Sequence, residues 1–179
     1  MEDWNVVVTV REHGFVQACE FLQMFGTVAR SDYFNVLTLA ADDPTAFPEA
    51  LHRELERQPE LLKALARVVP VVHTFRFQDP YEFEERVCQL ALTWVKQLAG
   101  HSFHVRMHRR GFKHRIESQH EELFLDHWLI EQLQAEGENA RVTFDDPDYI
   151  LAVETVGQRA GLSFWSRDLR ERYAFLGLD

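Results

Sequence analysis

The chain has 179 residues, enough for one ordinary domain or two small ones. Hydrophobic residues make up 46% of it and charged residues 27%, a composition that allows a packed core and excludes a disordered chain. The formal net charge of -10 taken alone argues against a nucleic-acid partner, because phosphates repel an acidic protein, so the distribution of the charge matters.

The first 77 residues show the element order β-α-β-β-α-β, which is typical of a ferredoxin-like domain. Runs of β-branched residues indicate the strands, and apolar residues at helical spacing indicate the helices. In chain order we predict a strand over 5–10, a helix over 15–25 ended by Gly26, strands over 27–29 and 35–40, a helix opened by Asp43-Pro44, a short helix through Leu62 and Leu65, and a strand over 71–77.

A domain boundary is predicted at Gln78-Asp79-Pro80, because proline suits the first turn of a helix. Residues 1–77 then form the ferredoxin-like domain and residues 78–179 a mixed α/β layer domain. The second domain is predicted to contain a helix closed by Gly100, a strand over 102–108, a helix from about Glu117 to Gln134, strands over 141–144, 149–156 and 162–166, and a turn over 145–148.

Positive charge is concentrated in the segment HSFHVRMHRRGFKHR, residues 101–115, which has no acidic residue. Segregated positive charge is what a polyanion site requires, and arginine can bind phosphate oxygens in bidentate fashion. The segment therefore predicts a nucleic-acid-binding surface on an acidic chain. Its cations are Arg106, Arg109, Arg110, Lys113 and Arg115, accompanied by four histidines.

Alternation along the predicted strand 102–108 gives it one apolar face for helices and one polar face. The apolar face carries Phe103, Val105 and Met107, and the polar face carries His104, Arg106 and His108.

After this strand, Gly111 permits a tight turn that presents the following cations together, and Phe112 could stack on an unpaired base. An alternative remains open, namely a solvated basic loop that balances Glu117, Glu121 and Glu122.

Catalytic, metal and cofactor signatures are not found in the sequence. His104 and His108 share a strand face but lie roughly 13 Å apart, too far to chelate one ion. Glu122 and Asp126 share a helix face, an arrangement that is most often solvated surface. Glu154 lies mid-strand among apolar neighbours, where a nearby arginine could pair with it. We therefore expect no catalytic residue, no metal and no cofactor.

Cys19 and Cys88 lie in apolar helical patterns and are expected to be reduced core thiols, which fits the cytoplasm. The acidic N-terminus with its short apolar run indicates a strand and not a signal peptide, and no membrane span is expected.

The strings SFHVRMHRRG and VTFDDPDYILAVETVGQRAGLSFWSRD resemble the THUMP domain, and the whole chain resembles the stand-alone THUMP proteins of the Tan type. That resemblance implies a ferredoxin-like domain packed on a THUMP domain. It also implies binding of tRNA at the acceptor stem and 3′ end, and a role as a non-catalytic adaptor for a separate modification enzyme such as an RNA cytidine acetyltransferase.

The residues and the resemblance together give one set of expected RNA-binding positions. The resemblance places Arg106, Arg109 and Arg110 in the R-x-x-R-R motif, and Arg159 and Arg167 beside an A-G-L-S turn. The full set is Arg106, His108, Arg109, Arg110, Phe112, Lys113, His114, Arg115, Arg159 and Arg167.

Three alternatives accompany this interpretation. The chain could be a protein-interaction subunit of an RNA-modification complex with weak RNA affinity. It could be an enzyme that uses His108, His114 and Glu154, provided that these side chains lie within hydrogen-bond reach of each other. A homodimer through an exposed sheet edge is also possible in principle.

Overall fold

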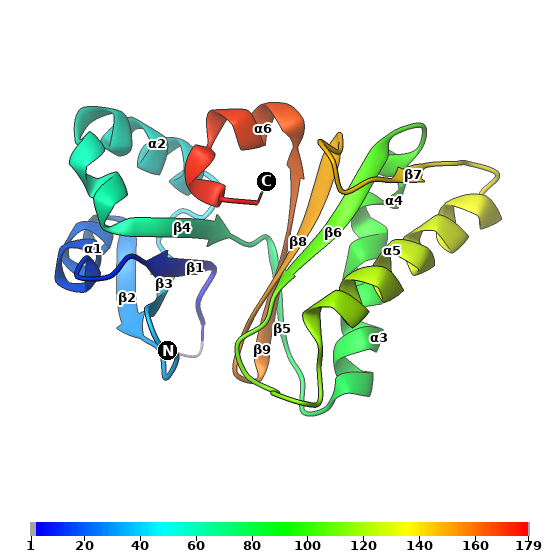
Figure 1. Cartoon of the computed structure of the whole chain (residues 1–179), viewed down its shortest axis with the longest axis horizontal. Coiled ribbons are helices and arrows are strands. Elements are labelled where there is room, and N and C mark those ends of the chain that lie inside the picture. Colours follow the sequence, from blue (N-terminus) through cyan, green and yellow to red (C-terminus); the bar gives the residue numbers. More distant parts are fainter. Residues whose placement is uncertain (1–2, 179) are drawn as a thin grey trace. The chain divides into compact units, whose positions relative to one another are not determined.

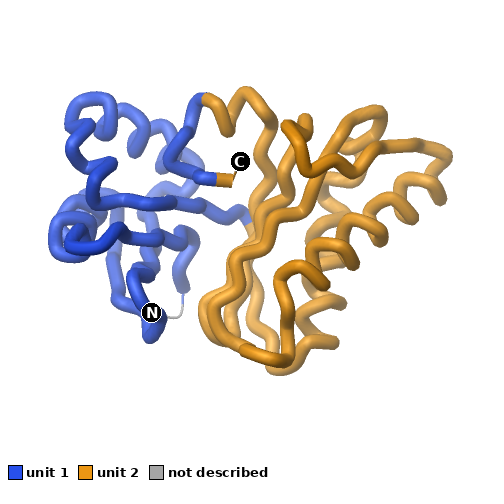
Figure 2. The backbone as a smooth tube through the Cα atoms, viewed as in Figure 1, with its two compact units in different colours: residues 1–72, 172–177 blue, residues 73–171, 178–179 orange. Residues whose placement is uncertain are grey.

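A computed structural model describes residues 3–178, which form two compact units (Figure 1, Figure 2). Within the described residues, the first unit contains 3–72 and 172–177, and the second contains 73–171 and 178. The predicted division of the chain into folding domains at 77 and 78 stays a prediction.

The first unit is built on a four-stranded sheet in the order β2-β3-β1-β4, in which every neighbouring pair is antiparallel. This order, with a helix after β1 and another after β3, confirms the ferredoxin-like topology. Its elements are β1 (Val6–Val10), α1 (Phe15–Leu22), η1 (Gln23–Phe25), β2 (Gly26–Arg30), β3 (Val36–Ala41), α2 (Phe47–Arg57), η2 (Pro59–Lys63) and β4 (Leu65–Pro70).

The fourth strand of this sheet differs from the prediction. β4 runs over 65–70, where a short helix was expected at Leu65, and residues 73–76 form β5 in the sheet of the second unit. Periodicity in the sequence does not show which sheet a strand joins. Pro70 between them is the last residue of β4.

Gly26 is required at the start of β2. Its φ angle is 151°, and an added Cβ would lie 2.1 Å from the carbonyl oxygen of Ala40. A side chain at this position would therefore push β2 away from β3, so this glycine fixes the close pairing that follows the helix.

The C-terminal segment 172–177 contributes to the first unit. Arg172 donates to both carboxylate oxygens of Glu49 on α2 at 2.8–3.0 Å, and the hydroxyl of Tyr173 donates to the same carboxylate at 3.0 Å. The Arg172 bonds are the main reason why the pKa of Glu49 falls to about 2. Sequence periodicity gave no sign of this segment's place, because the interaction spans 123 residues.

The second unit is built on a mixed five-stranded sheet in the order β5-β9-β8-β6-β7, with helices on one face (Figure 1). β6 is parallel to β7 and β8, and the other neighbouring pairs are antiparallel. Its elements are β5 (His73–Arg76), α3 (Pro80–Ala91), η3 (Leu92–Trp94), α4 (Val95–Leu98), β6 (Ser102–His108), α5 (Ser118–Ala135), β7 (Arg141–Val142), β8 (Tyr149–Val156), β9 (Arg159–Ser166) and α6 (Arg167–Arg172); η4 (Ala174–Leu176) follows.

The predicted alternation of β6 is confirmed. Phe103, Val105 and Met107 are at most 4% exposed and belong to the hydrophobic core beneath α3 and α5. The predicted A-G-L-S turn is wrong, because residues 160–163 lie inside β9, where they pair with β5 and β8.

The two cysteines are free thiols, Cys88 buried and Cys19 half-buried. None of the helices described within 3–178 is both apolar and long enough to traverse a bilayer.

Two carboxylates of α5 hold the edge of β6 that β7 leaves open. The pairing of β7 with β6 covers only Ser102 and Phe103. Beyond it, Asp126 accepts the backbone N–H of Val105 at 2.9 Å, and Glu122 accepts that of Met107 at 2.7 Å. The expectation that this pair is solvated surface is therefore wrong, since the unpaired N–H groups of a buried strand edge need acceptors.

We expect Asp126→Ala to lower the free energy of unfolding by about 2 kcal/mol, because the buried N–H of Val105 then has no acceptor. Urea denaturation measures the change. Glu131→Ala, which removes an exposed carboxylate from the same helix, is the control and should change the stability by less than about 0.5 kcal/mol. Equal losses for both variants would contradict a role in holding the strand edge.

Candidate nucleic-acid interface

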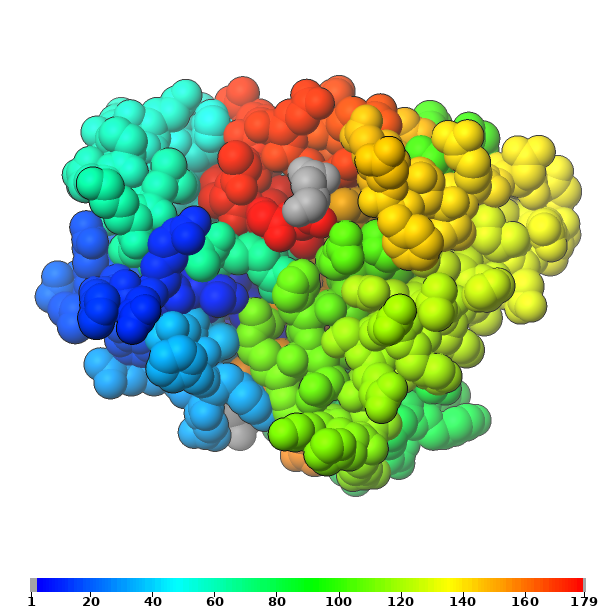
Figure 3. Space-filling model, viewed as in Figure 1, coloured from blue at the N-terminus to red at the C-terminus, as the bar shows by residue number. Residues whose placement is uncertain are grey.

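The basic segment ends at one end of the sheet of the second unit. β6 and β8 are parallel, so their carboxyl ends meet there, next to the turn between β8 and β9. The N–H of Gly157 in this turn donates to the carbonyl of Arg110 at 2.8 Å. The loop 109–117 is thus fixed to the end of the sheet, and its yellow-green surface lies at the bottom of Figure 3.

Arg110 is paired inside the protein. Its guanidinium lies 2.5 Å from the carboxylate of Glu154, which is fully buried on β8, and its backbone N–H donates to the hydroxyl of Thr155 at 2.9 Å. The Nδ1 atom of His108 lies 3.7 Å from the same carboxylate. The expectation that Glu154 pairs with a nearby arginine is confirmed, and Arg110 balances the charge of this buried carboxylate.

Arg109 and Phe112 shape the turn after β6. Arg109 donates to the carbonyl of Gly111, whose φ angle is 106°. The centroid of the Phe112 ring lies 4.9 Å from that of Phe77, and the ring packs on the core. The guanidinium of Arg115 lies over the Phe112 ring, 5.2 Å from its centroid. Phe112 therefore has a packing role, and its stacking on a base stays a prediction.

The remaining cations of the segment are turned to solvent or to a hollow in the surface. Lys113, His114 and Arg115 are exposed. Within residues 3–178, neither Lys113 nor Arg115 forms an ion pair, so the alternative of a loop balanced by its neighbouring glutamates is not favoured. Arg106 is half-buried and also has no ion pair in that range.

Arg106 lines a hollow of about 290 Å³ on the polar face of β6, together with Phe144 and Asp145. His104 lines the same hollow but is only 1% exposed, because its ring lies against Asp126 and Phe144. Of the polar face predicted for β6, Arg106 is thus available at the hollow, whereas His104 is buried.

Arg159 lies at the same end of the sheet as the loop. Its guanidinium donates to the hydroxyl of Thr74 on β5 at 2.7 Å. Arg76, which is exposed, stands opposite Arg159 in the β5–β9 pairing and adds a cation to this end of the sheet. Sequence reasoning missed Arg76, since the order of strands in the sheet is not visible in the spacing of residues.

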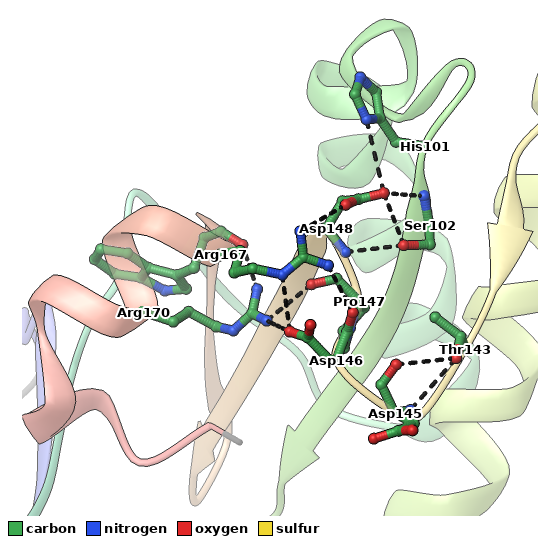
Figure 4. A network of polar contacts seen from close by, with 10 residues as sticks. His101, Ser102, Thr143, Asp145, Asp146, Pro147, Asp148, Arg167 and Arg170 are labelled. Carbon is green, nitrogen blue, oxygen red and sulfur yellow. Dashed lines mark hydrogen bonds and ion pairs between the residues drawn. The ribbon is translucent and has the colours of Figure 1, made fainter.

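Arg167 lies at the other end of the sheet, where β6 begins (Figure 4). It contacts Asp146 at 2.8 Å and Asp148 at 3.0 Å. Asp148 also accepts the backbone N–H and the hydroxyl of Ser102, both at 2.8 Å, and these bonds are the main reason why its pKa falls to about 2. The structure thus separates Arg167 from the other expected RNA-binding residues.

The alternative enzyme site is not assembled. His108 and Glu154 lie 3.7 Å apart, but within the described part of the chain the exposed side chain of His114 forms no hydrogen bond or ion pair with either. A three-residue acid–base arrangement needs mutual hydrogen-bond reach, and this set lacks it in the structure.

No protein-family model matches the chain, and no curated protein matches it. Among solved structures it is similar to PH1313 from Pyrococcus horikoshii Ot3, with a TM-score of 0.60, 10% identity, and coverage of 90% of this chain and 54% of that one. It is also similar to TrmN from Thermus thermophilus, with a TM-score of 0.58, 22% identity, and coverage of 90% and 44%. A third is a 4-thiouridine synthetase in complex with RNA and bound ATP, with a TM-score of 0.56, 13% identity, and coverage of 92% and 42%.

The chain has a THUMP-like α/β fold. Identities of 10–22% show the fold alone, and the chain spans about half or less of the length of each of these proteins, from 42% to 54%. These structural similarities do not show that the chain belongs to the Tan type of THUMP proteins.

The expectation that the chain is not an enzyme is contradicted by the same comparison. The similar structures include a predicted N6-adenine-specific DNA methylase from Listeria monocytogenes, with a TM-score of 0.53 and 13% identity, and a putative methyltransferase complexed with SAH. Since this THUMP-like fold occurs in proteins described as enzymes, the lack of a nucleotide signature in the chain did not justify that exclusion.

We expect Arg110→Ala to lower the free energy of unfolding by about 3 kcal/mol, because it leaves the buried carboxylate of Glu154 without its closest cation. The neighbouring change Arg109→Ala removes a bond to a loop carbonyl and should cost about 1 kcal/mol or less. Chemical denaturation of both variants measures the difference. A larger loss for Arg109→Ala would contradict this division of roles.

The network at Asp148 predicts an acid-dependent contribution to stability. Because the folded-state pKa of about 2 lies below the ordinary value of 3.8, ionised Asp148 stabilises the fold above about pH 4 and loses this effect as the pH falls towards 2. Asp148→Asn should therefore be less stable than the wild type at pH 7, and the gap should narrow between pH 4 and 2. Denaturation over that range tests it, with Asp145→Asn in the same turn as the control, and a gap independent of pH would refute the prediction.

Proposed function

We propose that the chain binds tRNA through phosphate contacts of the loop after β6 and of Arg106, and presents the acceptor stem and 3′ end to a modification enzyme. The cytoplasm is the expected place, and an RNA cytidine acetyltransferase is one such enzyme. The proposal rests on one observation: within residues 3–178, Arg106, Arg109, Lys113 and Arg115 have no carboxylate partner, although the chain carries a formal charge of -10.

Electrostatics support an anionic ligand at this surface. A guanidinium has five N–H donors, and within residues 3–178 Arg109 uses its side chain only for the carbonyl of Gly111. Lys113 and Arg115 are exposed, so they can meet phosphate without first breaking an ion pair within the protein. His108 and His114 would add positive charge at this end of the sheet when protonated.

The expected RNA-binding residues do not support the proposal equally. Arg110 and Arg167 are bound to carboxylates of the chain, so phosphate would have to compete with Glu154 and Asp146 for them. The proposed phosphate contacts are therefore made by the other cations, and Arg159 extends them towards β5. Similarity to a protein solved in complex with RNA supports the choice of RNA as the polyanion.

We expect the triple change Arg109→Glu, Lys113→Glu and Arg115→Glu to weaken tRNA binding at least tenfold at low salt, because three cations become anions. The slope of log K against log salt should become shallower by about 2 to 3, close to one for each lost phosphate contact. Fluorescence anisotropy with labelled tRNA at several salt concentrations measures both quantities. Arg110→Glu is unsuitable here, since it would place two carboxylates together and unfold the loop.

Arg141→Glu is the matched control. Arg141 is exposed on β7, opposite Ser102 at the far end of β6 from the loop, so one charge of the three is reversed away from the proposed surface. This variant should keep at least half of the wild-type affinity. A loss in log K for Arg141→Glu that exceeds one third of the loss for the triple variant would mean that net charge alone governs binding. Unchanged binding by the triple variant, or no tRNA binding by the wild type, would leave the protein-interaction subunit as the explanation.

A further inference from the structure

A cluster of possible metal ligands lies between α3 and the first turn of α5, which directly follows the basic loop. Glu84 on α3 and the consecutive residues His120 and Glu121 on α5 each offer one ligand atom, and these three atoms lie within 4.8 Å of one another. The two helices that supply them belong to the same compact unit and contact each other.

One carboxylate oxygen of Glu121 lacks a hydrogen-bond partner within residues 3–178, although the residue is buried. It is 2% exposed, and its Oε2 atom forms no hydrogen bond within residues 3–178. Its Oε1 atom lies 3.5 Å from Nδ1 of His120, which is itself exposed. A carboxylate that is buried with an unsatisfied oxygen beside a second carboxylate is costly, and a bound cation removes both costs together.

We propose that Glu84, His120 and Glu121 bind one divalent transition-metal ion of the zinc class. An imidazole nitrogen and two carboxylate oxygens are ligands that Zn²⁺ accepts, and three protein ligands leave a position for water. The imidazole disfavours Mg²⁺ and Ca²⁺, which prefer all-oxygen ligands. The exposed side of His120 gives the ion a path from solvent.

Cys88 lies one turn after Glu84 on α3 and is the nearest soft ligand to consider. Burial, and then the charges of Glu84 and Glu121, raise the pKa of its thiol to about 12. The cluster of ligand atoms that lie within 4.8 Å of one another does not include its sulfur, so the site is of nitrogen and oxygen type. A bound ion would join α3 to the first turns of α5, the helix whose Glu122 and Asp126 hold β6.

The test is a titration of the full chain, freed of any affinity tag and stripped with chelator. Zn²⁺ binding is measured by calorimetry, and Co²⁺ binding by its visible absorption. We expect one ion per chain with a Kd in the micromolar range. The Co²⁺ complex should show weak d–d bands without the intense near-ultraviolet band of a cobalt–thiolate bond. Mg²⁺ at a hundredfold excess should not displace Zn²⁺.

Variants separate a metal site from a fold effect. His120→Ala and Glu121→Gln should each weaken Zn²⁺ binding at least tenfold, whereas His127→Ala, an exposed histidine of the same helix, should not. Without metal, Glu121→Gln should melt at or above the wild-type temperature, because it removes a buried charge. Zn²⁺ should raise the melting temperature of the wild type but not that of Glu121→Gln. No binding by the wild type, or equal binding by Glu121→Gln and the wild type, would overturn the proposal.

Discussion

The open edge of β6 is the constraint on which the rest of the second unit depends. A strand of the sheet interior needs acceptors on both sides, yet β7 covers only two residues of β6. The carboxylates of Asp126 and Glu122 supply the missing acceptors and thereby dock α5 on the sheet. Because the strand is fixed at both edges, its face alternation is fixed as well: Phe103, Val105 and Met107 enter the core, and Arg106 lines the outer hollow. The loop with the free cations begins where this fixed strand ends.

The same division of acids and bases explains how an acidic chain keeps a basic surface. Three acids that contact β6 or the start of the loop are occupied: Asp126 and Glu122 accept backbone N–H groups, and Glu154 is buried against Arg110. An acid that is bound to the backbone or to its own cation is not available to neutralise an exposed cation on the loop. Net charge therefore misleads as a guide to this surface, and what matters is which side chains retain unpaired charge after folding.

Hydrophobic periodicity and residue composition predicted a strand or helix well where the pattern lies within that element alone. The strands 102–108 and 149–156 were placed at their observed bounds, and the ferredoxin-like order of the first unit is confirmed. The failures have one cause, which is long-range pairing. Residues 65–70 and 73–76 are both strands, but only their partners, β1 for one and β9 for the other, decide which sheet each one joins. Likewise, Ala160–Ser163 contains a glycine typical of turns, yet pairing on both sides makes it a strand.

The candidate site shows the same limit at the level of single residues. Arg109 and Arg110 are adjacent and chemically identical, and sequence gave them one role. In the structure Arg110 reaches a fully buried glutamate 44 positions away, whereas Arg109 reaches only the carbonyl of its own turn. A guanidinium held by a buried carboxylate has its charge matched and contributes to the rigidity of the turn, while its neighbour keeps most of its donors. Rigidity and free charge both suit the phosphate contacts proposed for this loop, because an ordered loop loses less conformational entropy when it meets its ligand. The two adjacent arginines of the R-x-x-R-R segment therefore have different roles: Arg110 stabilises the turn, and Arg109 keeps most of its donors for other contacts.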